Sequence, residues 1–203
     1  MIKKACLIFL LVLFFAFKAI CQTEGLSSRF YFPGGIGINI PSGDEQTSLK
    51  SGFTLNTAIE YRPTYTNAIF FRFNYDALSN RYKSFLNQIP TNVTRGKLAA
   101  DFFMLGAGYR RKLNKVSIYA LLQPGYNTSS YNIVTSDQSG VSVGNVSSNH
   151  LSTKISVGLE YYIVPHFALV FEPGYYHLFK TRSAYILNPD YVSYNIGFTT
   201  TLF

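Results

Sequence analysis

The sequence predicts an all-β protein, an eight-stranded antiparallel up-and-down transmembrane β-barrel. Three observations support this prediction. Segments of about ten residues alternate between apolar and polar side chains along most of the chain, which is the pattern of half-exposed strands. Tight turns alternate with longer polar connections, as in barrels of the outer membrane. The chain also begins with the layout of an export signal.

Residues 1–21 are expected to be a secretory signal peptide. Lys3 and Lys4 precede an apolar stretch over residues 6–17, and this order is typical of such signals. A transmembrane anchor is the alternative, but the apolar stretch is shorter than the roughly 20 residues that a spanning helix needs. We expect cleavage after Cys21 and a barrel domain over residues 22–203. Acylation of Cys21 is the other alternative, although the residues before it lack the lipobox pattern.

Removal of this segment changes the composition of the chain. Cys6 and Cys21 are the two cysteines, so the mature chain would have no disulfide and no cysteine-based metal site. Loss of Lys3, Lys4 and Lys18 from the 18 basic residues leaves 15 against 10 acidic residues, a net charge of about +5. The charges form no cluster of the kind that nucleic-acid-binding proteins carry. Attraction to anionic headgroups or to an anionic ligand is compatible with the excess.

The predicted strands can be followed in order by their apolar faces. The segments are 30–38, 53–62, 69–76, 103–109, 116–122, 153–161, 167–171 and 194–202. Tight turns are expected near 63–66, 112–115 and 163–166, and longer connections over 41–51, 78–96, 128–149 and 179–189. A soluble sandwich would not require this alternation of short and long connections. It places both ends of the mature chain at the end with the tight turns, the periplasmic end.

A weak internal repeat supports a series of hairpins. The segments 58–61, 106–109 and 158–161 each end in tyrosine just before a tight turn. On two returning strands, 122–126 matches 171–175, with Pro-Gly-Tyr at the end of both. Glycines 34, 35 and 37 are interpreted as a bend in the first strand.

The apolar strand faces carry aromatic residues near both ends, as the interfacial girdles of membrane barrels do. The predicted periplasmic girdle contains Tyr61, Tyr109 and Tyr161, and the predicted outer girdle contains Tyr75, Tyr126 and Tyr175. The chain is only 14% charged, which is low for a soluble surface. We therefore expect the apolar faces to point toward lipid and the polar faces to point inward.

The last strand ends in Phe203, and a terminal aromatic residue resembles the signal that the barrel-assembly machinery reads. Phe203 lies on the opposite parity to Tyr194, Ile196 and Phe198, which departs from the usual pattern. Together with the hairpins that end in tyrosine, these features resemble the small outer membrane protein β-barrel domain family, which includes outer-membrane protein A-like and PorT-like barrels. This resemblance implies the fold and no shared catalytic residue.

Strand parity predicts which polar side chains face the barrel lumen. These are Glu60, Arg72, Gln123, Lys154, Glu160 and Glu172. Because eight strands leave an interior only wide enough for side chains, we expect a structural network of ion pairs and hydrogen bonds. A proton or ion path through the same residues is the alternative.

The sequence contains no motif that specifies an enzyme. His150, His166 and His177 have no metal-binding spacing. His177 with Ser183 could imitate a lipid A-modifying site, but the serine that should follow two residues after the histidine is absent. No glycine-rich phosphate loop is present. We expect no catalytic residues, no metal and no cofactor.

The expected function is that of a non-enzymatic integral protein of a Gram-negative-type outer membrane, either structural or partner-binding through long extracellular loops. The alternatives are a narrow pore or carrier for small or hydrophobic ligands and, third, a lipid A-modifying enzyme. Expected partners are outer-membrane lipids, the barrel-assembly machinery and an unidentified protein, but not nucleic acid.

Overall fold

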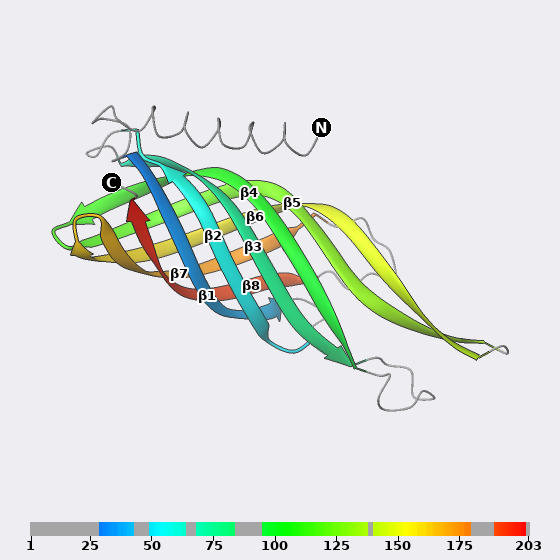
Figure 1. The fold of residues 1–203 in the computed structure, drawn as a ribbon. Coiled ribbons are helices and arrows are strands. Elements are labelled where there is room, and N and C mark those ends of the chain that lie inside the picture. The colour runs from blue at the N-terminus through cyan, green and yellow to red at the C-terminus, as the bar shows by residue number, and fades with distance from the viewer. Residues whose placement is uncertain are drawn as a thin grey trace, which may run out of the picture.

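The structure is a computed structural model that describes residues 29–42, 49–63, 68–83, 95–137, 140–179 and 189–201. These residues form a closed barrel of eight antiparallel strands, in which each strand pairs with its sequence neighbours and β1 pairs with β8 (Figure 1). The all-β barrel prediction is therefore confirmed. The strands are β1 (Phe30–Ser42), β2 (Gly52–Tyr61), β3 (Ile69–Lys83), β4 (Arg95–Leu113), β5 (Val116–Asp137), β6 (Gly140–Val164), β7 (Phe167–Leu178) and β8 (Asp190–Thr201). Among the described residues, no helix has the length and apolarity to cross a membrane.

Two of the predicted tight turns are two-residue connections at one end of the barrel. Leu113 pairs with Val116 around Asn114 and Lys115, and Asn114 has φ 54°, a left-handed conformation that asparagine tolerates. The second turn joins Val164 to Phe167. The turn expected near 63–66 lies largely outside the described residues. Tyr31 pairs with Thr201, so the start of β1 and the end of β8 lie at the same end as these turns.

The outer wall of the barrel is apolar over the middle of every strand. In β3, Ile69, Phe71 and Phe73 are exposed, and the alternating residues Phe70 and Arg72 are buried. The girdle tyrosines lie on the outer wall. Tyr109, Tyr126, Tyr161 and Tyr175 are exposed, and Tyr61 and Tyr75 are half-buried. Aromatic pairs lie on the same wall, with ring centroids 5.1 Å apart for Phe30 and Tyr61 and 5.2 Å apart for Tyr75 and Phe103.

The segment expected to be a loop at 128–149 is instead a long β-hairpin. β5 continues to Asp137 and β6 starts at Gly140, with paired residues from Val116↔Tyr161 to Asp137↔Gly140. The hairpin extends well beyond the rest of the barrel (Figure 1). Serine and asparagine dominate this segment, but tyrosine, threonine and valine alternate with them, and strand pairing satisfies the backbone. The expected connections over 41–51 and 78–96 are likewise shortened, because β1 reaches Ser42, β3 reaches Lys83 and β4 starts at Arg95.

The glycines of β1 lie in a continuous strand that closes the barrel against β8. A Cβ atom on Gly37 would lie 2.1 Å from the Tyr194 carbonyl oxygen, and one on Gly35 would lie 2.9 Å from the Ile196 carbonyl oxygen. Close approach of β8 therefore accounts for these glycines better than a bend alone. The predicted signal peptide (residues 1–21), the cleavage site at Cys21, Ser183 and Phe203 lie outside the described residues.

Candidate functional site

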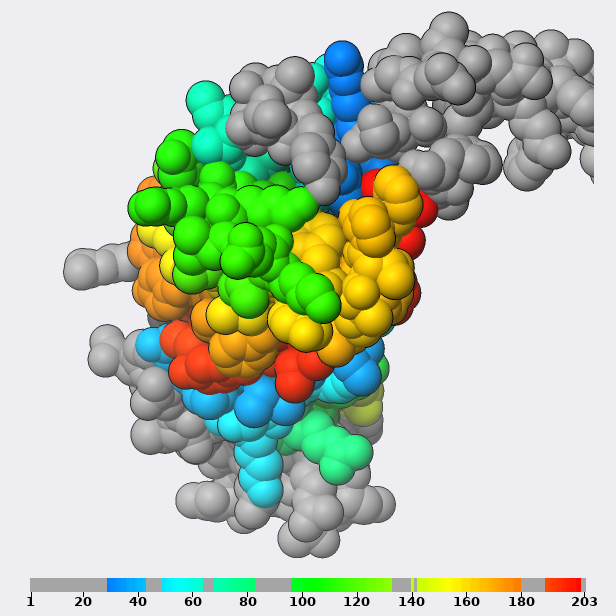
Figure 2. Space-filling view, turned by 90° about the vertical axis from the view of Figure 1, so that its left-hand side faces the viewer, coloured from blue at the N-terminus to red at the C-terminus, as the bar shows by residue number. Residues whose placement is uncertain are grey.

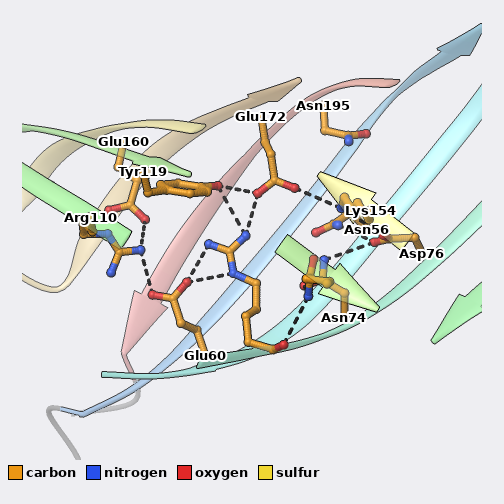
Figure 3. Close-up of polar contacts among 12 residues, drawn as sticks. Asn56, Glu60, Asn74, Asp76, Arg110, Tyr119, Lys154, Glu160, Glu172 and Asn195 are labelled. Atoms are coloured by element: carbon orange, nitrogen blue, oxygen red, sulfur yellow. Dashed lines mark hydrogen bonds and ion pairs between the residues drawn. The ribbon is translucent and has the colours of Figure 1, made fainter. Parts of the chain in front are cut away.

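The structure places the six predicted lumen residues inside the barrel, with little or no solvent exposure. They are Glu60 on β2, Arg72 on β3, Gln123 on β5, Lys154 and Glu160 on β6, and Glu172 on β7. Their strands surround the interior, so side chains that are distant in the sequence meet at its centre (Figure 3). Burial of this many charges is costly unless each is paired.

Glu60 is the centre of the charged interior. Its Oε2 atom lies 2.6 Å from Nη2 of Arg72, and its Oε1 atom lies 2.5 Å from Nε of Arg62 and 2.8 Å from Nη2 of Arg110. The same Arg110 nitrogen lies 2.8 Å from Oε1 of Glu160. One carboxylate therefore receives three guanidinium groups, and Glu160 balances part of their charge.

A second group of charges continues from Arg72 toward the long-connection end of the barrel. Nη1 of Arg72 lies 2.6 Å from Oε2 of Glu172, which also accepts a hydrogen bond from the Tyr119 hydroxyl. Nζ of Lys154 lies 3.1 Å from Oε1 of Glu172 and 3.0 Å from Oδ2 of Asp76. Arg72 and Glu172 thus connect the two groups into one chain of ion pairs (Figure 3).

We call this set the interior ion-pair network. Its members are Glu60, Arg62, Arg72, Asp76, Arg110, Lys154, Glu160 and Glu172. Four are cationic and four are anionic, so the network is formally neutral. Three members, Arg62, Asp76 and Arg110, were not among the predicted lumen residues. Their strand parity is the same as that of Glu60 and Arg72, and an application of the parity rule to every strand would have found them.

Amide side chains fill the space beside the network. Nε2 of Gln123 donates to the Arg72 carbonyl oxygen at 3.2 Å and to Oδ1 of Asn74 at 3.0 Å. The Asn56 amide donates to Asp76. These bonds hold side chains from β2, β3 and β5 in fixed positions, because a buried amide requires partners for its polar atoms.

Toward the long-connection end, apolar side chains enter the interior, among further buried polar side chains such as Asn80 and Asn127. A cluster of buried side chains crosses it, formed by Leu78, Ala100, Phe102, Met104, Tyr176, Leu178 and Tyr191. Phe102 lies at the centre, with ring centroids 4.8 Å from Tyr176 and 6.1 Å from Tyr191.

A small cavity lies in the wall of the barrel among the described residues. It has a volume of about 20 Å³ and lies beside the β1–β8 seam, near Gly35, Asn195 and Gly197. This volume is close to that of a single water molecule. Figure 2 looks onto the tight-turn end of the barrel, where side chains of the β4–β5 and β6–β7 connections lie at the front.

The internal repeat has a structural meaning. Glu60 and Glu160 occupy equivalent repeat positions, and both accept from Arg110. The third equivalent position is Gly108, where a Cβ atom would lie 2.3 Å from the Phe70 ring. Two repeats therefore supply a carboxylate, and the third leaves room for an aromatic ring.

The three histidines do not come together. His166 lies in the second tight turn, with Nδ1 3.2 Å from the Thr201 hydroxyl. His150 lies on β6 opposite Asn127, and Nδ1 of His177 lies 3.0 Å from Asp190 on β8. Within the described ranges, no group of three His, Cys, Asp or Glu residues is placed to hold a metal ion.

The projecting part of the β5–β6 hairpin presents a second feature, an exposed strand edge. Pairing of β5 with β4 ends at Ser130↔Ala99, and pairing of β6 with β7 starts at Ser152↔Leu178. Beyond these points, the two strands pair only with each other among the described residues. Val143 is 64% exposed. Among the residues that the structure describes, these outer edges therefore leave backbone groups with which another strand could pair.

The base of the hairpin is held by an apolar cluster. Tyr131 packs with Leu49, Tyr82 and Leu98, and Val146 packs against them. The Tyr82 hydroxyl donates to the Asn132 carbonyl oxygen. The rings of Tyr82 and Tyr131 meet edge to face, with centroids 6.1 Å apart. The hairpin thus leaves the barrel in a defined direction.

Comparison with known proteins gives a consistent result for the fold. Residues 7–200 match the family described as an outer membrane protein beta-barrel domain. A search of curated proteins finds no match. Among solved structures, Neisserial surface protein A (NspA) superposes with a TM-score of 0.59 at 19% identity, covering 88% of this chain and 100% of that chain.

Two further structures agree. A major outer membrane protein from Thermus thermophilus gives a TM-score of 0.58 at 15% identity, with 84% of this chain and 98% of that chain covered. OprG from Pseudomonas aeruginosa gives a TM-score of 0.52 at 13% identity, with 84% of this chain and 94% of that chain covered. At these identities the likeness shows the fold alone.

Proposed function

We propose that this chain, which belongs to the outer membrane protein β-barrel domain family, is a non-enzymatic, non-conducting outer-membrane protein that binds a partner through the β5–β6 hairpin. In barrels of this type the tight turns face the periplasm and the long connections face outward. The hairpin would then project from the cell surface, where a partner can reach it.

This proposal rests on one contrast. Side chains occupy the barrel interior, whereas the β5–β6 hairpin projects from the barrel. The interior ion-pair network and the apolar cluster around Phe102 fill the lumen. The hairpin extends past the other strands (Figure 1) and is anchored at Tyr131. The geometry therefore favours an external surface over a transport path.

The edge of the hairpin suits recognition by strand addition. Exposed edges usually carry lysine or proline, which prevent unwanted pairing. Residues 138–149 contain no charged residue and no proline. An extended segment of another protein could pair with this edge through its backbone, with Val143 and its neighbours providing the side-chain contacts.

In vivo photo-crosslinking tests the proposal. A crosslinker at Val143 should give a discrete product with a protein partner. A crosslinker at Val157, which is 51% exposed on the apolar wall, serves as the control and should contact lipid. A variant that joins Asn132 directly to Asn145, its pairing partner, through an Asn-Gly turn lacks residue 143, and it should no longer co-purify with the partner that the Val143 crosslinker captures.

The proposal fails if positions 143 and 157 give the same products, or if the shortened variant still binds the partner captured at Val143. Correct folding of the shortened variant is checked by its strand signal in circular dichroism. We expect it to fold, because the deletion leaves intact the cluster at the base of the hairpin, formed by Leu49, Tyr82, Leu98 and Tyr131.

A narrow pore or ligand carrier is the second candidate. Its support is the polar half of the interior, where Asn56 and Asn195 lie beside the small cavity. Lipid A modification is a third and weaker candidate, and it predicts a change in the mass spectrum of lipid A when the protein is expressed.

Export and assembly belong to the same proposal. Residues 1–21 would direct the chain across the inner membrane, and the barrel-assembly machinery would then recognise the final strand through Phe203. The aromatic residues 194 and 198 on the outer wall are compatible with that recognition.

A further inference from the structure

The outer wall of β3 and β4 carries basic residues at the long-connection end. Arg81 lies directly opposite Lys97 in the pairing of the two strands, and both side chains are exposed. Lys50 is also exposed, and its amide donates to the Arg81 carbonyl oxygen at 2.8 Å. Three basic residues from three chain segments are therefore backbone neighbours at one point of the rim.

The position of these residues along the strand matches the level of lipid headgroups. Arg81 comes twelve residues after Ile69, where the apolar wall of β3 begins. At about 3.3 Å per residue and a tilt near 40°, that distance is about 30 Å along the barrel axis. The apolar band of such barrels is about 25 Å tall. Arg81 and Lys97 thus lie just beyond the band.

The cations lack acidic partners among the described residues. None of Lys50, Arg81 and Lys97 takes part in an ion pair there. Asp101 lies on the same face of β4, and it accepts a hydrogen bond from Tyr75 at 2.8 Å. Like charges directly opposite each other on a sheet are destabilising. An anion between Arg81 and Lys97 would relieve that repulsion.

The backbone under these side chains is held in place. A Cβ atom on Gly96 would lie 2.1 Å from Cζ of Tyr82, so the Tyr82 ring lies directly over Gly96 on the inner face. Leu49 also pairs with Tyr82. Arg81 and Lys97 flank this contact in the sequence, and their register is therefore fixed on the outer face.

We propose that Lys50, Arg81 and Lys97 form a binding site for the phosphate groups of anionic lipids in the outer leaflet. The guanidinium of Arg81 can bind a phosphate through two parallel hydrogen bonds. The two ammonium groups supply further charge from either side. The site lies on the lipid-facing wall, and its ligand would be a lipid headgroup that also contacts the apolar residues below.

The test uses the full chain refolded into phosphatidylcholine vesicles that contain either lipid A or dephosphorylated lipid A. Lipid retained on the barrel after detergent extraction is counted by native mass spectrometry. We expect retention of the phosphorylated lipid and a loss of roughly tenfold or more in the triple variant K50Q/R81Q/K97Q. Retention should fall with rising salt.

A matched control removes the same number of charges at the opposite rim, with R29Q, R111Q and K115Q. It should retain the lipid as the parent does, and so should the charge-conserving variant R81K/K97R within a few-fold. Equal retention by the two triple variants would overturn the site. So would equal retention of the dephosphorylated lipid, or displacement of the lipid by equimolar inorganic phosphate, which would indicate a site for free phosphate.

Discussion

Glu60 makes more ion pairs than any other residue of the interior ion-pair network. Three arginines share its two carboxylate oxygens. The substitution Glu60→Gln would leave four cations against three anions in the buried network. We expect the free energy of unfolding to fall by about 3–5 kcal/mol, as when one partner of a buried ion pair is removed. Urea unfolding of the barrel in lipid vesicles measures this change.

Asp101→Asn is the matched control for that prediction. It makes the same chemical change on the outer wall, where Asp101 is only half-buried and is bonded to Tyr75. A loss below about 1 kcal/mol is expected there. If both variants lose a similar amount of unfolding free energy, Glu60 does not stabilise the interior charges more than an outer-wall carboxylate stabilises its surroundings.

Gly108 gives a second prediction at this scale. An added Cβ would lie 2.3 Å from the Phe70 ring and 2.6 Å from the Ala120 carbonyl oxygen. Gly108→Ala should therefore cost about 1–3 kcal/mol of stability through overpacking. In Gly34→Ala, the nearest atom would be the Asn56 carbonyl oxygen at 3.9 Å, and the stability should change little. Equal stability of the two variants would show that the Phe70 ring does not require a glycine at position 108.

Most individual interior residues were predictable from the sequence, because alternation assigns each side chain to one wall of the barrel. Parity placed Glu60, Arg72, Lys154, Glu160 and Glu172 inside. It could not indicate which of them would touch, since contacts across the lumen depend on strand stagger and tilt. The pairing of Arg110 with both Glu60 and Glu160 is a product of that stagger.

At the scale of elements, the β5–β6 hairpin depends on the cluster at its base. Tyr82→Phe keeps the aromatic ring and removes the hydroxyl that donates to Asn132. The lost bond is worth about 0.5–1.5 kcal/mol. Amides of residues 142–150 should then exchange hydrogen roughly 2–10 times faster, while those of residues 155–159 stay unchanged.

Tyr126→Phe is the control, since its side chain is exposed on the outer wall. It should leave exchange in both segments unchanged. If Tyr82→Phe also has no effect on residues 142–150, the cluster does not hold the hairpin.

The hairpin is also the element that sequence analysis missed. Its residues 140–149 are rich in serine, asparagine and glycine, a composition typical of loops. Their strand structure comes from pairing with β5, and short-range propensity is weak beside that pairing. The core strands were easier to predict because one face of each is uniformly apolar, as in Phe71 and Phe73.

At the scale of the whole molecule, processing of the N-terminus remains a prediction. The mature protein isolated from the outer membrane should begin at Gln22 and contain no cysteine. Intact mass and N-terminal sequencing would test this together. A mature chain that retains Cys21 with attached acyl groups would instead indicate a lipoprotein.

At the same scale, we propose that side chains fill the barrel interior and that the protein functions through its outer surface. The charged network and the apolar cluster around Phe102 occupy the interior in series, so an ion would have to displace both. The most direct test is the conductance of the purified, refolded protein in a planar lipid bilayer. We predict no stable channel openings above the baseline at moderate voltage. Reproducible single-channel steps that change when Phe102 is replaced by alanine would contradict the account.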